Sequence, residues 1–534
     1  MLDRKEGLAR STVIVYLASL AAQAVGVVTQ IVVAKLFGAR AEMDAFLAAC
    51  TLPQYLITVL TASLGAVFIP VFVEYTRKGQ TEEAWRIARG LLNQCVAFLA
   101  CLVIFGLLFA RPLLKWTTPG LTGATMDLAV RVALVTWPCI LATGVMSLLV
   151  GLYQAQEYFT RSVMVPLLGS VVNLALIPIL ATKWGVAGLA AAGTLSVFFQ
   201  VFMLLPILRR SQFSFTFAWD HPGIRSVWHL LWPLLLSNVL IRWTPVVERY
   251  LASGLPEGSI AHLGYAFKLL TYLTVFVSAG IGTTFFPRLA SSAANADPGE
   301  LRHTLALGLR LIWLMVAPVI AVGIVLSLPL VSALLQRGRF LPADAQSVAH
   351  LLVLYLPALA AMSLGSVTGR AFYAIKATRF IAGMGVIEAI LYVAYTVLLA
   401  RSWAASGIVL GYVLYFSLSL LWQLPFLWLR TGRTGGRTTI ISFSKTALAA
   451  LAAGMAAWAA ARGSAHPWTQ LALGSSAGLT AYAATLLAVR SSELRLLAGK
   501  MRNMTRGTTG GASPDTWPYD AAEVAHKTVE TETR

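Results

Sequence analysis

Cationic side chains inside apolar stretches are the residues of this sequence best suited to bind a charged ligand. Arg242 and Arg249 interrupt one apolar run, and Lys268 interrupts the next. Asn238, Arg242 and Arg249 are spaced at i, i+4 and i+11, which places them on one face of a continuous helix. A guanidinium in hydrocarbon requires an anionic partner, because an unpaired charge there is costly. These cations predict a site for a phosphate or pyrophosphate, which guanidinium binds in a bidentate way.

A purely structural interpretation of the same cations is the alternative. Glu248 and Asp44 are carboxylates in or beside these runs, and internal pairs with Arg242 and Arg249 would neutralise them. Three cations beside two carboxylates leave one positive charge without a partner, which favours the anion site. Glu248 lies about 80° around the helix from the arginines, so we expect it to orient Arg249 from the side.

Other polar residues form stripes along the same and neighbouring runs and are predicted to line the site. Polar side chains in a membrane span usually face the bundle interior or a water-filled cavity. Besides Arg242, Arg249 and Lys268, the candidates for substrate binding are Asn238, Asp44, Glu248, Gln23, Gln30, Thr51, Tyr55 and Tyr272. Glu388, the carboxylate of a later run, is a candidate for coupling to a proton or another ion, and equally a candidate for a structural group.

The composition requires a membrane as solvent. Hydrophobic residues make up 58% of the 534 residues and charged residues only 12%, which is more apolar surface than a soluble domain buries. Runs of about 20 apolar residues, enough to cross a hydrocarbon core of about 30 Å, recur about 14 times. The predicted fold class is therefore all-α, a polytopic membrane protein with about 14 transmembrane helices.

An internal duplication organises these helices. An offset of 217 to 219 residues aligns Leu52 with Leu269, Pro138 with Pro357 and Gly188 with Gly407. Chance matches between apolar helices would not align Pro and Gly at one nearly constant offset. Two six-helix repeats in parallel orientation, followed by two extra C-terminal helices, are expected. The predicted parts are an N-terminal lobe (1–214), a C-terminal lobe (215–432), two further helices (433–489), and a basic interfacial helix with a disordered tail (490–534).

The charge distribution predicts the orientation. With both termini in the cytoplasm, about 28 of the Lys and Arg residues fall in cytoplasmic segments and about 13 in exterior ones, as the positive-inside rule expects. The net charge of +19 needs no nucleic-acid partner, because basic residues beside helix ends are attracted by anionic headgroups. We expect no metal site and no cofactor, since the four cysteines form no Cys-x-x-Cys pair and the seven histidines are scattered. We expect no enzymatic activity, since the sequence has no catalytic pair and no long exterior loop.

Several motifs carry a family resemblance. They are Val33-Ala-Lys-Leu-Phe-Gly-Ala39, Met43-Asp-Ala-Phe46, Phe68-Ile-Pro-Val-Phe-Val-Glu-Tyr75, Gly264-Tyr-Ala-Phe-Lys-Leu269 and Gly338-Arg-Phe340. With them the sequence resembles the MurJ/MviN lipid II flippases of the MOP exporter superfamily. The resemblance implies a 14-helix fold in two lobes, with a cavity formed by helices 1, 2, 7 and 8. It also implies alternating access that carries the lipid-linked peptidoglycan precursor to the outer leaflet of the bacterial cytoplasmic membrane. The implied partners are that anionic lipid-linked saccharide, membrane lipids and proteins of cell-wall synthesis.

The sequence departs from the family pattern where arginines are usual in helices 1 and 2. The matching positions here are Gln23, Thr29, Ile57 and Thr58, whereas Asp44 and Lys268 match functional positions. We therefore expect the cationic site to be displaced toward the run that holds Arg242. This departure leaves a flippase for another lipid-linked polysaccharide, such as an O-antigen or exopolysaccharide unit, as an alternative. A multidrug or cation antiporter of the same superfamily is a second alternative, although it would favour an anionic cavity.

Overall fold

The computed structural model describes residues 2–211, 221–294, 298–375, 377–432, 436–491 and 493. Every regular element in these ranges is a helix. The elements are α1 (Leu2–Phe37), α2 (Ala41–Arg77), α3 (Thr81–Leu108), α4 (Ala110–Thr117), α5 (Gly123–Thr136), α6 (Pro138–Ala155), α7 (Phe159–Leu204), the 3-10 helix η1 (Leu205–Ser211), α8 (Pro222–Ile241), α9 (Thr244–Ser253), α10 (Ser259–Ala294), α11 (Pro298–Leu335), α12 (Pro342–Ala374), α13 (Thr378–Thr431), α14 (Gly436–Ala461) and α15 (Pro467–Ala488).

The helices are those of a multi-pass membrane protein. Among the described residues, 11 helical segments are long and apolar enough to cross a membrane. Two of them, containing α7 and α13, bend at non-helical residues near their middle, and each holds two of the predicted spans. The all-α membrane fold is confirmed, whereas the number of 14 spans stays a prediction.

The bends in α7 and α13 have the same construction. The chain takes a positive φ of 59° at Gly185, a backbone conformation that glycine adopts without steric cost. Gly188 then lies against the carbonyl of Leu180, where a Cβ would be only 2.1 Å from the oxygen. Gly407 lies against the carbonyl of Leu399 with the same 2.1 Å approach. Leu399 and Gly407 follow Leu180 and Gly188 by 219 positions, as the duplication predicts.

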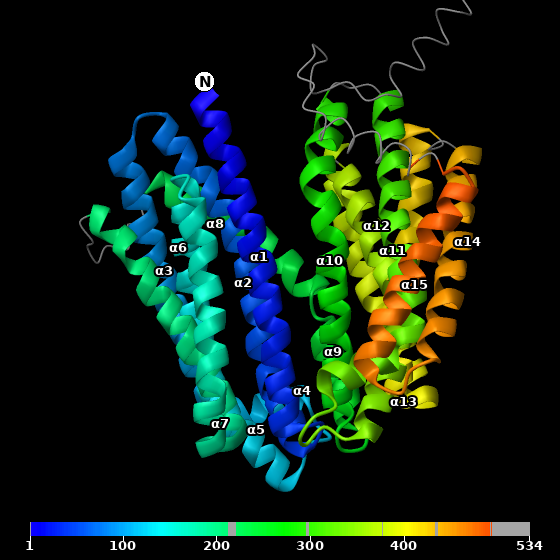
Figure 1. The fold of residues 1–534 in the computed structure, drawn as a ribbon. Helices are drawn as coiled ribbons and strands as arrows, with labels where there is room; N and C mark the ends of the chain where they lie inside the picture. The colour runs from blue at the N-terminus through cyan, green and yellow to red at the C-terminus, as the bar shows by residue number, and fades with distance from the viewer. Residues whose placement is uncertain are drawn as a thin grey trace, which may run out of the picture. The chain divides into compact units, whose positions relative to one another are not determined.

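The chain packs as two compact units. The first contains Met1–Phe276, Ser327–Met362 and Lys376–Trp422, and the second contains Val277–Leu326, Ser363–Ile375 and Gln423–Arg534. In the first unit α2 packs on α5, α6 and α8, and Figure 1 shows α1 and α2 running alongside α7. All candidate site residues of the sequence belong to this first unit. The predicted lobe boundaries stay a prediction.

The second unit contains the two helices predicted after the duplication. These helices, α14 and α15, pack closely together through small side chains such as the buried Ala449 and Ala453. They also pack on α11, where Trp313 stacks on Phe443 with ring centroids 5.4 Å apart. The hydroxyl of Tyr482 donates to the Leu314 carbonyl at 2.5 Å. Most of the predicted interfacial helix at 490–506 and the tail after it lie outside the described residues.

Candidate functional site

The apolar run that holds Arg242 and Arg249 forms two helices. α8 ends one residue before Arg242, and α9 begins two residues after it. Pro245 lies in the first turn of α9, where its fixed φ and missing N–H suit the start of a helix but not its interior. The prediction of one continuous helix, on which Asn238, Arg242 and Arg249 would share a face, is therefore wrong. Arg242 caps the end of α8, and Arg249 belongs to a separate helix.

Arg242 is exposed and held by neutral partners. Its Nε donates to Oδ1 of Asn238 at 2.8 Å, and the Asn238 amide donates to the Ser63 hydroxyl of α2 at 3.2 Å. No carboxylate of the described residues lies within ion-pair distance of Arg242. The α2–α8 contact therefore fixes the direction of an accessible guanidinium whose charge is free to meet an anion. Sequence reasoning found Arg242 and Asn238 but missed Ser63.

The contacts of Arg249 agree with the structural interpretation, in which the cation pairs with a carboxylate of the protein. Its Nη1 donates to the carbonyl of Ile260 at 3.0 Å and lies 3.5 Å from Oε1 of Glu248. The side chains of Arg249 and Glu248 are only 13% and 7% exposed. Glu248 Oε1 accepts no hydrogen bond, so this is a buried ion pair without a hydrogen bond. Such a pair positions α9 rather than presenting a charge to a ligand.

Asp44 acts on the backbone of a neighbouring helix. Its buried carboxylate accepts from the backbone N–H of Gly258 at 2.6 Å and of Ala261 at 2.7 Å, at the start of α10. In return, Glu257 accepts from the backbone N–H of Ala41 at 2.9 Å, at the start of α2. Unpaired N–H groups at a helix start need such acceptors. The starts of α2 and α10 thus cap each other, and we call this arrangement the α2–α10 junction.

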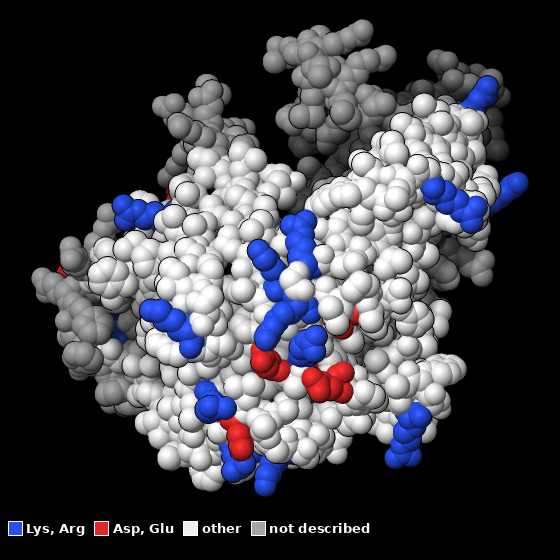
Figure 2. Space-filling view, turned by 60° about the horizontal axis from the view of Figure 1, so that its bottom comes forward, with Lys and Arg blue, Asp and Glu red and all other residues white. Residues whose placement is uncertain are grey.

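The loop before α2 strengthens this end of the first unit. Gly38 has a φ of 61°, and a Cβ there would lie 2.4 Å from the carbonyl oxygen of Arg339. The Arg339 N–H donates to the Lys35 carbonyl at 3.1 Å, and its guanidinium donates to Glu42 at 3.2 Å. Tyr265 donates to the Gly38 carbonyl at 2.9 Å. Figure 2 shows the face at this end of the molecule, where basic and acidic side chains gather.

The helices α1, α2, α8 and α10 carry candidate residues for substrate binding, and contacts link these helices in pairs. The Tyr55 hydroxyl of α2 donates to the Val239 carbonyl of α8 at 2.6 Å. Tyr272 of α10 packs on Gly26 of α1, where a Cβ would lie 3.4 Å from its hydroxyl. The predicted grouping of these helices is therefore present within the first unit. Lys268 is exposed and has no ion pair to a described carboxylate.

The other predicted polar residues differ in their accessibility. Gln23 and Gln30 of α1 are partly exposed, as residues of a lining should be. Thr51 is buried, and its hydroxyl donates to the Leu47 carbonyl of its own helix at 2.7 Å. Hydroxyl donation to a carbonyl four residues earlier is a common way to satisfy threonine in a helix. Thr51 therefore contributes packing, whereas Arg242 and Lys268 are the exposed charged candidates of the site.

Glu388 lies apart from these residues, between the two arms of α13. It is partly buried, and its Oε1 accepts a hydrogen bond from the indole N–H of Trp422. The Trp422 ring in turn packs edge-on against Phe380, with centroids 5.6 Å apart. An indole donor satisfies either a carboxylate or a carboxamide, so this contact fits the structural interpretation of Glu388.

Comparison with known protein families shows the family to which the chain belongs. The family model described as "Lipid II flippase MurJ" matches residues 33–474, which include both ends of the α2–α10 junction and every site candidate except Gln23 and Gln30. The chain belongs to the MurJ family. Curated relatives of the family match most of the chain. The probable lipid II flippase MurJ of Bdellovibrio bacteriovorus is 26% identical over 427 residues, 77% of this chain and 80% of the relative. That of Vibrio cholerae is 25% identical over 71% of this chain and 75% of the relative.

Solved structures show the same fold. A MurJ flippase in an inward closed conformation superposes with a TM-score of 0.77 over 89% of this chain and 99% of the solved chain, at 18% identity. An inward-facing multidrug resistance MATE transporter of the MOP superfamily has a TM-score of 0.64 at 15% identity, over 76% of this chain and 94% of the solved chain. The MurJ architecture is thus shared with transporters that are not MurJ.

Proposed function

We propose that this protein translocates lipid II, the polyprenyl-pyrophosphate-linked precursor of peptidoglycan, from the inner to the outer leaflet of the bacterial cytoplasmic membrane. Family membership supports the substrate. The observation that carries the binding step is the accessible guanidinium of Arg242, held by Asn238 and free of any carboxylate among the described residues. A cation kept in a membrane-spanning region without an internal counter-ion suits an anionic passenger.

The pyrophosphate is the part of the substrate that Arg242 fits. A guanidinium can donate two parallel hydrogen bonds to phosphate oxygens, and the Asn238 contact keeps its plane fixed before the ligand arrives, which lowers the entropy lost on binding. Lys268 adds a second accessible charge from α10. Gln23 and Gln30 of α1 would contact the neutral saccharide, because amides both donate and accept hydrogen bonds. Arg249, Glu248 and Asp44 would position helices rather than touch the substrate.

The α2–α10 junction supports alternating access. It closes one end of the first unit through hydrogen bonds between helices that the duplication relates. With both termini in the cytoplasm, as the distribution of basic residues favours, this closed end faces the exterior. The opposite end would then admit substrate from the inner leaflet. Breaking the mutual caps and reforming them is a two-state change of the kind that transporters use.

Another lipid-linked saccharide remains the second candidate substrate. The observation that favours it lies in α1 and α2, where Gln23 is neutral and the Thr29 hydroxyl donates to the Val25 carbonyl of its own helix. No cation stands at these positions, so the charge of the site comes from α8 and α10. A lipid-linked saccharide with one phosphate fewer would need fewer cationic contacts.

Complementation tests the proposal and separates the substrates. We expect the wild-type protein to sustain growth of a strain depleted of its own lipid II flippase, and not to restore O-antigen or exopolysaccharide export in strains that lack those flippases. Arg242→Ala should abolish growth at normal protein abundance, whereas Arg86→Ala, which removes an exposed arginine of α3, should not. Restoration of polysaccharide export without restoration of growth would overturn the lipid II assignment.

A further inference from the structure

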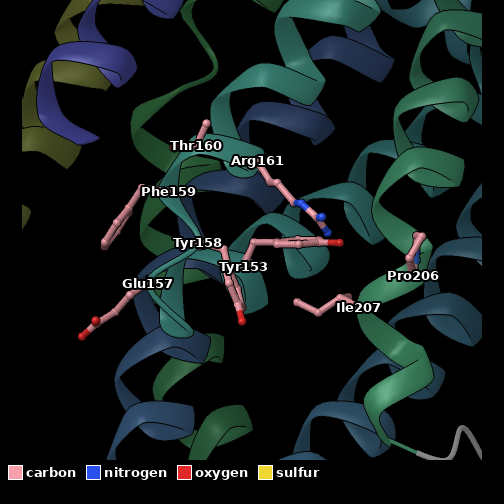
Figure 3. A pocket seen from close by; sticks show the side chains of 8 residues that line it. All are labelled: Tyr153, Glu157, Tyr158, Phe159, Thr160, Arg161, Pro206 and Ile207. Atoms are coloured by element: carbon pink, nitrogen blue, oxygen red, sulfur yellow. The ribbon is translucent and has the colours of Figure 1, made fainter. Parts of the chain in front are cut away.

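A pocket of about 420 Å³ lies at the end of α6, away from all of the site residues above. Figure 3 shows its lining, which comes from three parts of the chain: the last turn of α6, the turn into α7, and η1. Its polar side chains are those of Tyr153, Glu157, Tyr158, Thr160 and Arg161. Neither the sequence motifs nor the proposed transport site uses these residues.

Arg161 supplies an uncompensated charge to the pocket. Its side chain points across the pocket toward the ring and hydroxyl of Tyr153 (Figure 3). Arg161 is exposed, and within the described parts of the chain it forms no ion pair and no hydrogen bond. Glu157 is the carboxylate of the lining, and Figure 3 shows it directed away from Arg161. Among the residues that the structure describes, the pocket therefore presents a cation with no anion opposite it.

The turn that carries these residues is fixed by its own contacts. Glu157 takes a positive φ of 65°, and the N–H of Tyr158 donates to the carbonyl of Tyr153 at 2.9 Å. The rings of Tyr153 and Tyr158 meet edge to face with centroids 6.4 Å apart. Tyr153 is only 2% exposed, so its ring cannot turn away from the pocket. The turn and the Tyr153 ring are thus held in place before any ligand binds, which favours affinity.

Apolar side chains continue from the pocket along both arms of α7. Met164 and Leu168 follow Arg161 on the first arm, Phe198 and Phe202 lie on the second arm, and Leu205 begins η1. All five are exposed, between 36% and 66%, on a helix apolar enough to span a membrane. An apolar surface beside a small basic pocket matches a ligand with one charged end and long hydrocarbon chains.

We propose that this pocket binds the phosphate group of a lipid in the cytoplasmic leaflet, with the acyl or prenyl chains along α7. The leaflet follows from the proposed orientation, because α6 ends at the same end of the bundle as the N-terminus. The phosphate accepts hydrogen bonds from the Arg161 guanidinium and from the Tyr153 hydroxyl, which lie beside each other in Figure 3. Charge-assisted hydrogen bonds, such as the one from Arg161, are the strong ones. The site holds lipid whether or not the protein transports lipid II.

Native mass spectrometry of the purified full-length protein tests this proposal. The protein is titrated separately with phosphatidylglycerol, with undecaprenyl phosphate, and with diacylglycerol, which lacks phosphate. We expect Arg161→Ala to weaken binding of at least one of the two phosphate lipids about tenfold, the loss of one charge-assisted contact, and to leave diacylglycerol retention unchanged. Whichever phosphate lipid responds identifies whether the source is a bulk phospholipid or a polyprenyl carrier.

Two further variants control the experiment. Arg77→Ala removes an exposed arginine at the end of α2, at the same end of the bundle but outside the pocket, and it should leave lipid affinity unchanged. Tyr153→Phe removes one hydroxyl without changing the shape of the buried ring, so it should weaken binding even if Arg161→Ala folds poorly. Equal affinities in wild type, Arg161→Ala and Tyr153→Phe would overturn the proposal. So would competition by millimolar inorganic phosphate, because the site would then bind a free anion.

Discussion

At the residue scale, the three cations singled out by the sequence have different environments. Arg242 is exposed and bonded to neutral Asn238, whereas Arg249 is buried beside Glu248. The residue types and the apolar runs around them were sufficient to find both. Their roles could not be predicted, because spacing gives a direction around a helix only while that helix continues, and Pro245 ends it.

Removing Arg249 should destabilise the protein, whereas removing Arg242 should not. Arg249→Met leaves the buried Glu248 carboxylate without a counter-charge, which costs about 3 kcal/mol. Thermal unfolding in detergent should show a lowered midpoint for Arg249→Met and an unchanged one for Arg242→Met. The double variant Arg249→Met, Glu248→Gln should recover part of the loss, since no charge remains buried. A midpoint for Arg249→Met equal to wild type would contradict the assignment of this pair to structure.

Glu388→Gln should preserve transport. A glutamine carbonyl accepts from the Trp422 indole as a carboxylate does, so a structural Glu388 needs no charge. Growth of the flippase-depleted strain with Glu388→Gln should match wild type, and Glu388→Leu, which cannot accept this bond, should lower protein abundance. Loss of growth with Glu388→Gln at normal abundance would instead identify a carboxylate whose protonation is coupled to transport.

At the element scale, helix starts and bends organise the first unit. The α2–α10 junction joins two helices through backbone N–H groups that carry no sequence signal of their own. Asp44 was recognisable as a carboxylate in the first turn of a helix, but it was assigned to the substrate because its backbone partners lie more than 200 residues away. The bends in α7 and α13 lie close to Gly188 and Gly407, which the duplication had matched from the sequence.

Removing the Asp44 carboxylate should loosen the start of α10. Asp44→Ala leaves the N–H groups of Gly258 and Ala261 without acceptors at a helix start, a loss of about 1 to 3 kcal/mol. Hydrogen–deuterium exchange should become faster at residues 258–262 and stay unchanged in the α14–α15 pair, which belongs to the second unit. Asp44→Asn, which keeps one acceptor oxygen, should give an intermediate rate. Unchanged exchange at 258–262 in Asp44→Ala would show that these caps do not hold the junction closed.

At the scale of the whole molecule, the composition and the internal duplication were sufficient to predict the fold class. Apolar runs can only cross a bilayer as helices in a chain of this kind, and the Pro and Gly matches related one half to the other. Family membership agrees with both. The sequence could not predict how exposed each polar side chain is. Thr51 and Gln23 both belong to polar stripes, yet Thr51 is buried and Gln23 is partly exposed.

The central claim is that accessible cations of α8 and α10 bind the pyrophosphate of a lipid-linked saccharide. The most direct measurement is the equilibrium affinity of the purified protein in nanodiscs for lipid II, compared between wild type and the double variant Arg242→Ala, Lys268→Ala. Loss of two charge-assisted contacts should weaken binding by at least about tenfold, while Arg86→Ala binds as wild type does. Equal affinity of the double variant and wild type for lipid II would contradict the account.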